Sequence, residues 1–314
     1  MGRYIRKRLL QAVPVVFGIT ILTFFIMKMA PGGPLTGMIS PRTSSESLQR
    51  AREALGLNDP IIVQYWNWLK QLVQGNFGYS TYNGQAVLTE ILDRLPATLL
   101  LTVTSFVISF VVGIPLGVYS ATHKYSKADY GLTVFSIPSF FFGMGLIFVF
   151  ALKLKWLPTS GFGSSTFNGE GMALILHKLK YLIMPALVMS LSNLATVMRF
   201  ARSSMIETLN QDYVRTARAK GLSEKVVIYK HALKNSMIPV ITIFGQSIPN
   251  LFGGAYITEK VFGWPGMGLL GVDAINNRDY QMLMGLTLFT AILVLLGNLL
   301  ADIMYSFVDP RIRY

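Results

Sequence analysis

The sequence predicts an all-α, polytopic membrane protein with six transmembrane helices, an external helical loop domain and a pair of cytoplasmic helices. Of its 314 residues, 52% are hydrophobic and only 14% are charged, whereas soluble domains carry about 25% charged residues. Apolar runs of about 20 residues, the length that crosses a hydrocarbon core of roughly 30 Å, recur along the chain. The net charge of +13 is concentrated between these runs, which is typical of cytoplasmic loops next to membrane spans.

The expected spans follow from these runs. They lie at about 9–30, 97–120, 131–153, 180–200, 237–258 and 281–306. The first run follows a positively charged start, as in a secretory signal, but it is longer than the usual 7 to 15 apolar residues and no A-x-A-like cleavage site follows, so we expect it to be retained. The fifth run contains Pro249, Gly253 and Gly254, and we expect it to be bent.

The distribution of basic residues predicts the orientation. With the N-terminus inside, the inner segments hold sixteen of the 28 Lys and Arg residues and few acidic ones. These sixteen are Arg3, Arg6, Lys7, Arg8, Lys124, Lys127, Arg199, Arg202, Arg215, Arg218, Lys220, Lys225, Lys230, Lys234, Arg311 and Arg313. The positive-inside rule then places both termini in the cytoplasm of a multi-pass protein of the cell membrane.

The segment 31–94 is long enough to form a small external domain. Within it, "GLNDPIIVQYWNWLKQLVQGNFGYS" places Pro60 at the first position of a helix. Ile62, Tyr65, Trp66 and Leu69 follow at helical spacing. We expect this amphipathic helix to be a cap packed on the membrane domain, with direct contact to an external ligand or protein as the alternative.

The largest cytoplasmic segment, about 202–236, predicts a helix, a sharp corner and a second helix. Met205, Leu209, Tyr213 and Ala217 recur every four residues and give the first helix an apolar face. Gly221 can take the left-handed conformation that ends a helix, and Ser223 can cap the next one. Small residues at the corner favour docking into a groove of a second protein. The alternative is a basic amphipathic anchor on the membrane surface.

Several function classes are disfavoured by what the sequence contains. There is no cysteine, so thiolate metal sites and cysteine nucleophiles are excluded, and the three histidines form no ligand pair. An ion-coupled transporter would need ionisable residues inside spans. Only Lys28 and Asp302 come close, and both lie near span ends, where snorkelling or local pairing explains them. A nucleic-acid binder would carry its charge on a soluble domain. We therefore predict no catalytic residue, no metal site and no nucleic-acid partner.

Four separated stretches resemble the permease subunits of binding-protein-dependent ABC importers of the oligopeptide and dipeptide branch. They are "DYVRTARAKGLSEKVVIYKHALKNSMIPVIT", the external "GLNDPIIVQYWNWLKQLVQGNFGYS", "VFGWPGMGLLGVDAINNRDY" and the terminal "DPR". The general coupling motif opens with Glu-Ala-Ala, whereas Arg215, Thr216 and Ala217 stand here, and its Leu-Pro is matched by Ile238-Pro239. Both departures are typical of the peptide branch, and they leave open which side chain replaces the glutamate.

The resemblance implies a transport subunit without enzymatic activity, working with a second homologous permease, two cytoplasmic ATPase subunits and an extracytoplasmic substrate-binding protein. ATP and Mg²⁺ would be bound by the ATPases, since this chain has no G-x-x-x-x-G-K-[ST] loop and needs no cofactor of its own. The implied ATPase-coupling residues are Asp212, Tyr213, Arg215, Thr216, Ala217, Arg218, Ala219, Gly221, Leu222 and Ser223. The expected substrate is a peptide. A nickel or metal-chelate importer of the same family is the alternative, and an ATP-independent transporter is a more remote one.

The predicted domains follow from these assignments. Residues 1–30 are the cytoplasmic N-terminus and first span, and residues 31–94 are the external loop domain. Residues 95–306 form the transmembrane domain with five further helices, including the coupling segment 202–236. Residues 307–314 are a cytoplasmic tail.

Overall fold

The computed structural model describes residues 2–30, 45–54, 56–123, 138–163 and 169–308, and over these residues it is helical without strands. The helices before the corner are α1 (Gly2–Met29), α2 (Ser45–Ala54), α3 (Ile61–Val73), α4 (Val87–Thr122), α6 (Ser139–Leu146), the π-helix η3 (Ile147–Lys153) and α7 (Met172–Leu209). After α7 come α8 (Asp212–Ala219), α9 (Glu224–Val226), the π-helix η4 (Val227–Ala232), α10 (Leu233–Ser247), the 3₁₀ helix η5 (Pro249–Phe252), α11 (Tyr256–Val261), α12 (Met267–Asn276) and α13 (Tyr280–Val308).

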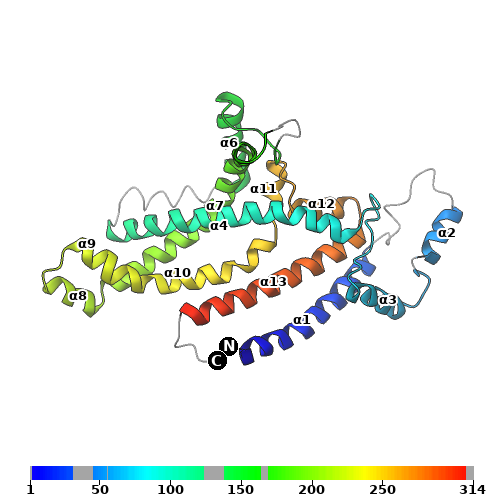
Figure 1. The fold of residues 1–314 in the computed structure, drawn as a ribbon, viewed down its shortest axis with the longest axis horizontal. Helices are drawn as coiled ribbons and strands as arrows, with labels where there is room; N and C mark the ends of the chain where they lie inside the picture. Colours follow the sequence, from blue (N-terminus) through cyan, green and yellow to red (C-terminus); the bar gives the residue numbers. More distant parts are fainter. Residues whose placement is uncertain (1, 31–44, 55, 124–137, 164–168, 309–314) are drawn as a thin grey trace.

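Among the described residues, four helices are long and apolar enough to cross a membrane: Arg6–Met29, Val87–Thr122, Met172–Leu209 and Tyr280–Met304. They correspond to the first, second, fourth and sixth predicted spans. Figure 1 shows α1, α4, α10 and α13 lying lengthwise in one elongated bundle. The α8–α9 corner lies at one end of this bundle, and α3 and α12 lie at the other.

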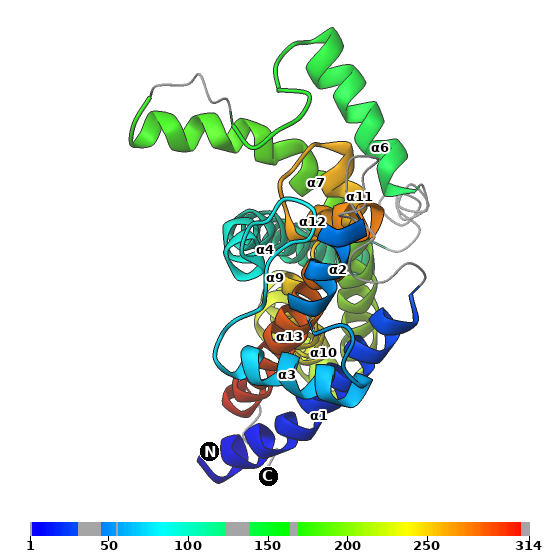
Figure 2. The same cartoon turned by 90° about the vertical axis from the view of Figure 1, so that its right-hand side faces the viewer.

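The two remaining predicted spans differ from the expectation. Span 131–153 falls partly outside the described residues, and its described part is the short pair α6 and η3, which extends away from the bundle (Figures 1 and 2). Span 237–258 is irregular, as predicted. Helix α10 gives way to η5 at Pro249, and the chain turns at Gly254, where φ is +73°.

The core of the bundle is the contact between α4 and α7. At Gly117 of α4, an added Cβ would lie 2.6 Å from the backbone oxygen of Met198 and 2.7 Å from the Cβ of Ala201. Ser109 donates a hydrogen bond of 3.0 Å to the carbonyl of Ser190. Small residues thus let the two backbones approach closely, as is usual between membrane helices.

Helix α3 packs on the end of α1 with a face that the sequence predicts only in part. Tyr65 and Trp68 are buried against Phe24 of α1 and Met284 of α13, so the cap packed on the membrane domain is present. Trp66, which the helical spacing assigned to this packed face, is 49% exposed. Trp68, two positions later, is buried in this contact instead.

Candidate functional site

The corner predicted from the sequence is built by a break after α7. That helix ends at Leu209, and α8 starts three residues later at Asp212. After α8, the continuous helical run α9–η4–α10 leads back into the bundle. The corner is therefore joined on both sides to long helices, so its position is fixed by theirs.

Gly221 ends α8 in the left-handed conformation that the sequence predicts. Its φ is +77°, and its N–H donates to the carbonyl of Arg218 over 2.9 Å. An added Cβ would meet nothing within 4 Å, so the requirement for glycine comes from the backbone angle alone. Ser223 occupies the N-cap position of α9, but its side chain makes no capping hydrogen bond.

The buried side of the corner contains Met205, Leu209 and Ala217 of the predicted apolar face, but not Tyr213. Val214 and Ala217 of α8 pack with Met205 of α7, Val118 at the end of α4 and Val227 of η4. The predicted spacing fails at Tyr213, where Val214 is buried instead, because the helix breaks at Asn210 and the register changes between α7 and α8.

Tyr213 consequently lies on the surface, where its hydroxyl accepts a hydrogen bond of 2.9 Å from the Nδ2 of Asn235. Nine of the ten predicted coupling residues are exposed, but Ala217 is only 5% exposed and faces the core. The small residues available to a partner are Ala219 and Gly221.

An ion pair that the sequence reasoning missed spans the corner. The Nε of Arg218 lies 2.8 Å from Oε1 of Glu224, and Nη2 donates to Oε2 over 3.4 Å. Glu224 and Asp212 are thus the carboxylates at the corner, where the general coupling motif has a glutamate. In the sequence, the opposite charges of Arg218 and Glu224 on either side of Gly221 could have indicated this ion pair.

The opposite end of the bundle contains a fully buried carboxylate, which the sequence reasoning did not single out. Glu259 of α11 is 0% exposed and accepts hydrogen bonds from the N–H groups of Ala255 (3.0 Å) and Leu269 (2.7 Å). Burial raises the pKa of Glu259 above its ordinary value, although backbone hydrogen bonds and the charge of Arg94 act in the other direction. At Gly266, an added Cβ would lie 2.3 Å from the Cδ of Glu259. The carboxylate therefore joins α11 to the start of α12 in a site that only glycine leaves open.

Two further contacts fix this end. The indole N–H of fully buried Trp264 donates to the carbonyl of Ala97 in α4 over 2.8 Å. Asp279, before α13, accepts hydrogen bonds from Ser80 and from both the N–H and hydroxyl of Thr81. A polar recess of about 340 Å³ lies beside Asp279. Segments far apart in the sequence are thus held together by buried polar contacts.

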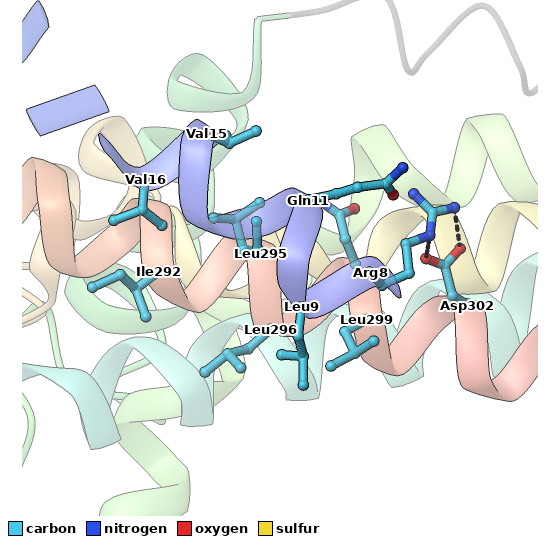
Figure 3. Close-up of a pocket in the computed structure, with 12 residues that line it drawn as sticks. Arg8, Leu9, Gln11, Val15, Val16, Ile292, Leu295, Leu296, Leu299 and Asp302 are labelled. Carbon is cyan, nitrogen blue, oxygen red and sulfur yellow. Dashed lines mark hydrogen bonds and ion pairs between the residues drawn. The ribbon is translucent and has the colours of Figure 1, made fainter. Parts of the chain in front are cut away.

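The ionisable groups near the span ends have local partners. In the groove between α1 and α13, of about 420 Å³ (Figure 3), Arg8 lies 3.0 Å from Asp302. The Nζ of Lys28 donates a hydrogen bond to the Oε1 of Gln64 in α3. It also lies 5.5 Å from the centre of the Phe24 ring. Over the described residues, no group of three His, Asp or Glu side chains could hold a metal ion.

The chain is similar to known membrane transport proteins over its whole length. Residues 113–314 match the family described as binding-protein-dependent transport system inner membrane component, and residues 1–102 match its N-terminal membrane component family. The oligopeptide transport system permease protein AppB of Bacillus subtilis is 47% identical over the full length of both chains.

Two more distant relatives also align over the full length of both chains. The dipeptide transport system permease protein DppB of Alkalihalophilus pseudofirmus and the glutathione transport system permease protein GsiC of Shigella flexneri are each 37% identical. The chain therefore belongs to the family of inner membrane components of binding-protein-dependent transport systems, and it is a permease subunit rather than an enzyme.

Proposed function

We propose that this chain forms half of the translocation pathway of an ATP-driven peptide importer in the cell membrane, with the α8–α9 corner as its contact to a cytoplasmic ATPase. The observation that carries the proposal is an exposed, sharply turned helix pair between α7 and α10 whose inner side packs on α4 and α7. The partners are a second homologous permease, two ATPase subunits that bind ATP and Mg²⁺, and an external substrate-binding protein.

The arrangement of the helices supports six spans with both termini on the cytoplasmic side. In Figure 1, α4 and α7 both run toward the corner, so the chain must cross back between them, where the third span is expected. Helix α10 runs away from the corner, and α13 runs back in the direction of the corner. The start of α1 and the end of α13 thus lie on the sides of these helices that are nearer the corner, where the Arg8–Asp302 pair joins them.

Helix length supports a corner outside the membrane. The 36 residues of α4 and the 38 residues of α7 correspond to about 54 and 57 Å at 1.5 Å per residue, well beyond the roughly 30 Å of hydrocarbon. Basic Arg215, Arg218, Lys220 and Lys225 lie exposed at this end. They fit the cytoplasmic side by the positive-inside rule.

The printed names of the relatives support a peptide substrate. They are described as permeases for oligopeptides, dipeptides, di- and tripeptides, or glutathione. Every one of these substrates has a peptide backbone or an amide-linked equivalent, so we propose a peptide for this importer in place of a metal chelate.

The corner would couple ATP hydrolysis to transport mechanically. Val214 and Ala217 tie α8 to the ends of α4 and α7, so a displacement of α8 by a closing ATPase is transmitted to those spans instead of being absorbed by a loose loop. Rigid-body rocking of the two permeases would then alternate access to the pathway.

Gly221→Val tests this proposal in the assembled transporter. A β-branched residue strains the left-handed position, so α8 should be misplaced while the spans still insert and the binding protein still docks. In proteoliposomes with ATP enclosed at the cytoplasmic face, uptake of labelled di- to pentapeptides and peptide-stimulated ATP hydrolysis should fall together.

Lys225→Gln is the matched control, because it removes one exposed charge just after the corner without changing backbone geometry. It should retain uptake. Normal uptake by Gly221→Val together with loss of uptake by Lys225→Gln would show that the segment acts as an electrostatic membrane anchor, and the proposed coupling contact would be wrong.

A further inference from the structure

Helix α3 carries two separate apolar stripes, and only one of them is used in packing. Tyr65, Trp68 and Leu72 form the first stripe, which packs on α1 and α13. Ile62, Trp66 and Val73 form the second, at the four- and seven-residue spacing that places side chains on one face of a helix. Leu69 lies between the two stripes and packs against the first. A helix that packs on a protein with one face needs no second apolar face.

The second stripe is exposed over most of its length. The side chains of Ile62, Trp66 and Val73 are 66%, 49% and 83% exposed. On the remaining face of the helix lie the exposed polar residues Asn67, Lys70 and Gln71, with one exposed apolar residue, Val63, in the first turn. The helix therefore has three faces: one against the protein, one apolar and exposed, and one polar and exposed.

The exposed stripe continues the outer surface of α1. Phe25 of α1, which is 38% exposed, stacks on Tyr65 with ring centroids 6.2 Å apart. Tyr65 in turn meets Trp66 edge-on at 5.8 Å. Next to Phe25, the side chain of Ile26 is 58% exposed. Because α1 is long and apolar enough to cross a membrane, its exposed apolar surface would meet lipid there, and the stripe on α3 adjoins it.

The direction of α3 fits a position at the membrane boundary. Seen from the end of the bundle in Figure 2, α3 lies crosswise in the plane of the view, whereas α4 is seen nearly end-on. A helix at the end of a span, lying across it, is placed in the interfacial layer where acyl chains meet headgroups. Tryptophan is enriched at this depth, because its ring is apolar and its N–H is polar.

We propose that α3 is an interfacial membrane helix that rests on the outer leaflet, with Ile62, Trp66 and Val73 in contact with lipid and Asn67, Lys70 and Gln71 facing water. The occupant of the exposed stripe is the bilayer of phospholipid. This role goes beyond transport, since it concerns how the external domain is held at the membrane and does not require the pathway to operate.

Fluorescence quenching in reconstituted vesicles tests this placement, and the absence of native cysteine allows single labels. The full chain carrying Trp66→Cys or Ile62→Cys is labelled with bimane and reconstituted in phosphatidylcholine and phosphatidylglycerol. Part of the lipid carries bromine on the acyl chain. Asn67→Cys is the matched control, one residue from Trp66 on the polar face.

Brominated lipid should quench the labels at positions 62 and 66 several-fold more strongly than the label at 67. Aqueous iodide should give the reverse order. Equal and strong iodide quenching at all three positions would overturn the proposal, because the stripe would then face water. Labels at 62 and 66 that neither quencher reaches would also overturn it, since another protein would cover the stripe. None of these readings depends on uptake, so they stay separate from a failure of the proposed transport function.

Discussion

At the corner, Arg218 and Glu224 form an ion pair on an exposed surface, whereas at the opposite end of the bundle Glu259 is completely buried and Asp279 is 2% exposed. The corner's turn depends on the backbone angle of Gly221, around which there is open space. At the other end, Gly266 is required because a carboxylate occupies the position of its missing side chain. Glycine is thus needed for its backbone conformation at one end and for its lack of a side chain at the other.

Because of this difference, substitutions at the two ends should affect different properties of the protein. The corner presents its residues to solvent and rests on a small apolar cluster, so changes there should alter contacts with partners more than the stability of the fold. The opposite end is held by buried polar groups that have their hydrogen-bond partners in place, so removing a member leaves a cavity or an unsatisfied group. Stability measurements in detergent can separate the two cases.

The largest expected effect is that of Trp264→Ala at the buried end. The side chain is 0% exposed, packs edge-on against Phe162 and donates to the carbonyl of Ala97. Its removal should lower the free energy of unfolding by about 3 to 5 kcal/mol. Trp156→Ala is the control, because that ring is 66% exposed, and its cost should stay within about 0.5 kcal/mol. Equal losses in thermal unfolding would contradict the assigned burial.

The two glycines should respond differently to the same pair of substitutions. Gly266→Ala should cost about 1 to 3 kcal/mol by overpacking, and Gly221→Ala should cost roughly 1 to 2 kcal/mol by backbone strain. Asparagine separates the causes, because it tolerates the left-handed conformation. Gly221→Asn should therefore be milder than Gly221→Ala, whereas Gly266→Asn should be at least as severe as Gly266→Ala. If thermal unfolding ranked the Ala and Asn variants in the same order at both positions, the two glycines would not differ in the way proposed.

The buried carboxylate should give the stability a pH dependence. Burial raises the pKa of Glu259 above the ordinary 4.5, so its contribution to stability is present below pH 4.5 and is lost as the pH rises through the folded-state pKa. Glu259→Gln removes this titration while keeping the side-chain size. The melting temperature of the Gln variant relative to the parent should rise with pH above 4.5. A relative melting temperature that is constant with pH would show that Glu259 does not titrate differently on folding.

The smallest expected effect on stability is that of Arg218→Gln at the corner. The ion pair with Glu224 is bidentate, but the two side chains are 42% and 61% exposed, and exposed pairs contribute about 0.2 to 1 kcal/mol. The loss should shrink further at high salt because mobile ions screen the attraction. A salt-independent loss comparable to that of Trp264→Ala would mean that the corner is held by charge.

Much of the architecture could be predicted from the sequence because apolar length is a local property. The first, second, fourth and sixth runs are helices, and the irregularity of the fifth follows from Pro249 and Gly254. The left-handed Gly221 was also predictable, since a glycine between two helical patterns has few other uses.

Other features depend on tertiary contacts and could not be predicted this way. The choice of Trp68 over Trp66 for burial is set by where Phe24 and Met284 lie. The inward side of α8 depends on the break at Asn210, which no strong helix breaker marks. The role of Glu259 is visible only once the chain brings Gly266 and Leu269 against it.

A photo-crosslink from the corner tests the proposed ATPase contact most directly. Ser223→Cys, a single cysteine in an exposed position, would carry a short photoreactive group in membranes that contain the assembled transporter. The contact predicts a covalent adduct between this chain and an ATPase subunit. The same group at Tyr82→Cys, exposed at the opposite end, should give no such adduct. Adducts from position 223 only with lipid, and none with an ATPase subunit, would contradict the account and identify the corner as a membrane anchor.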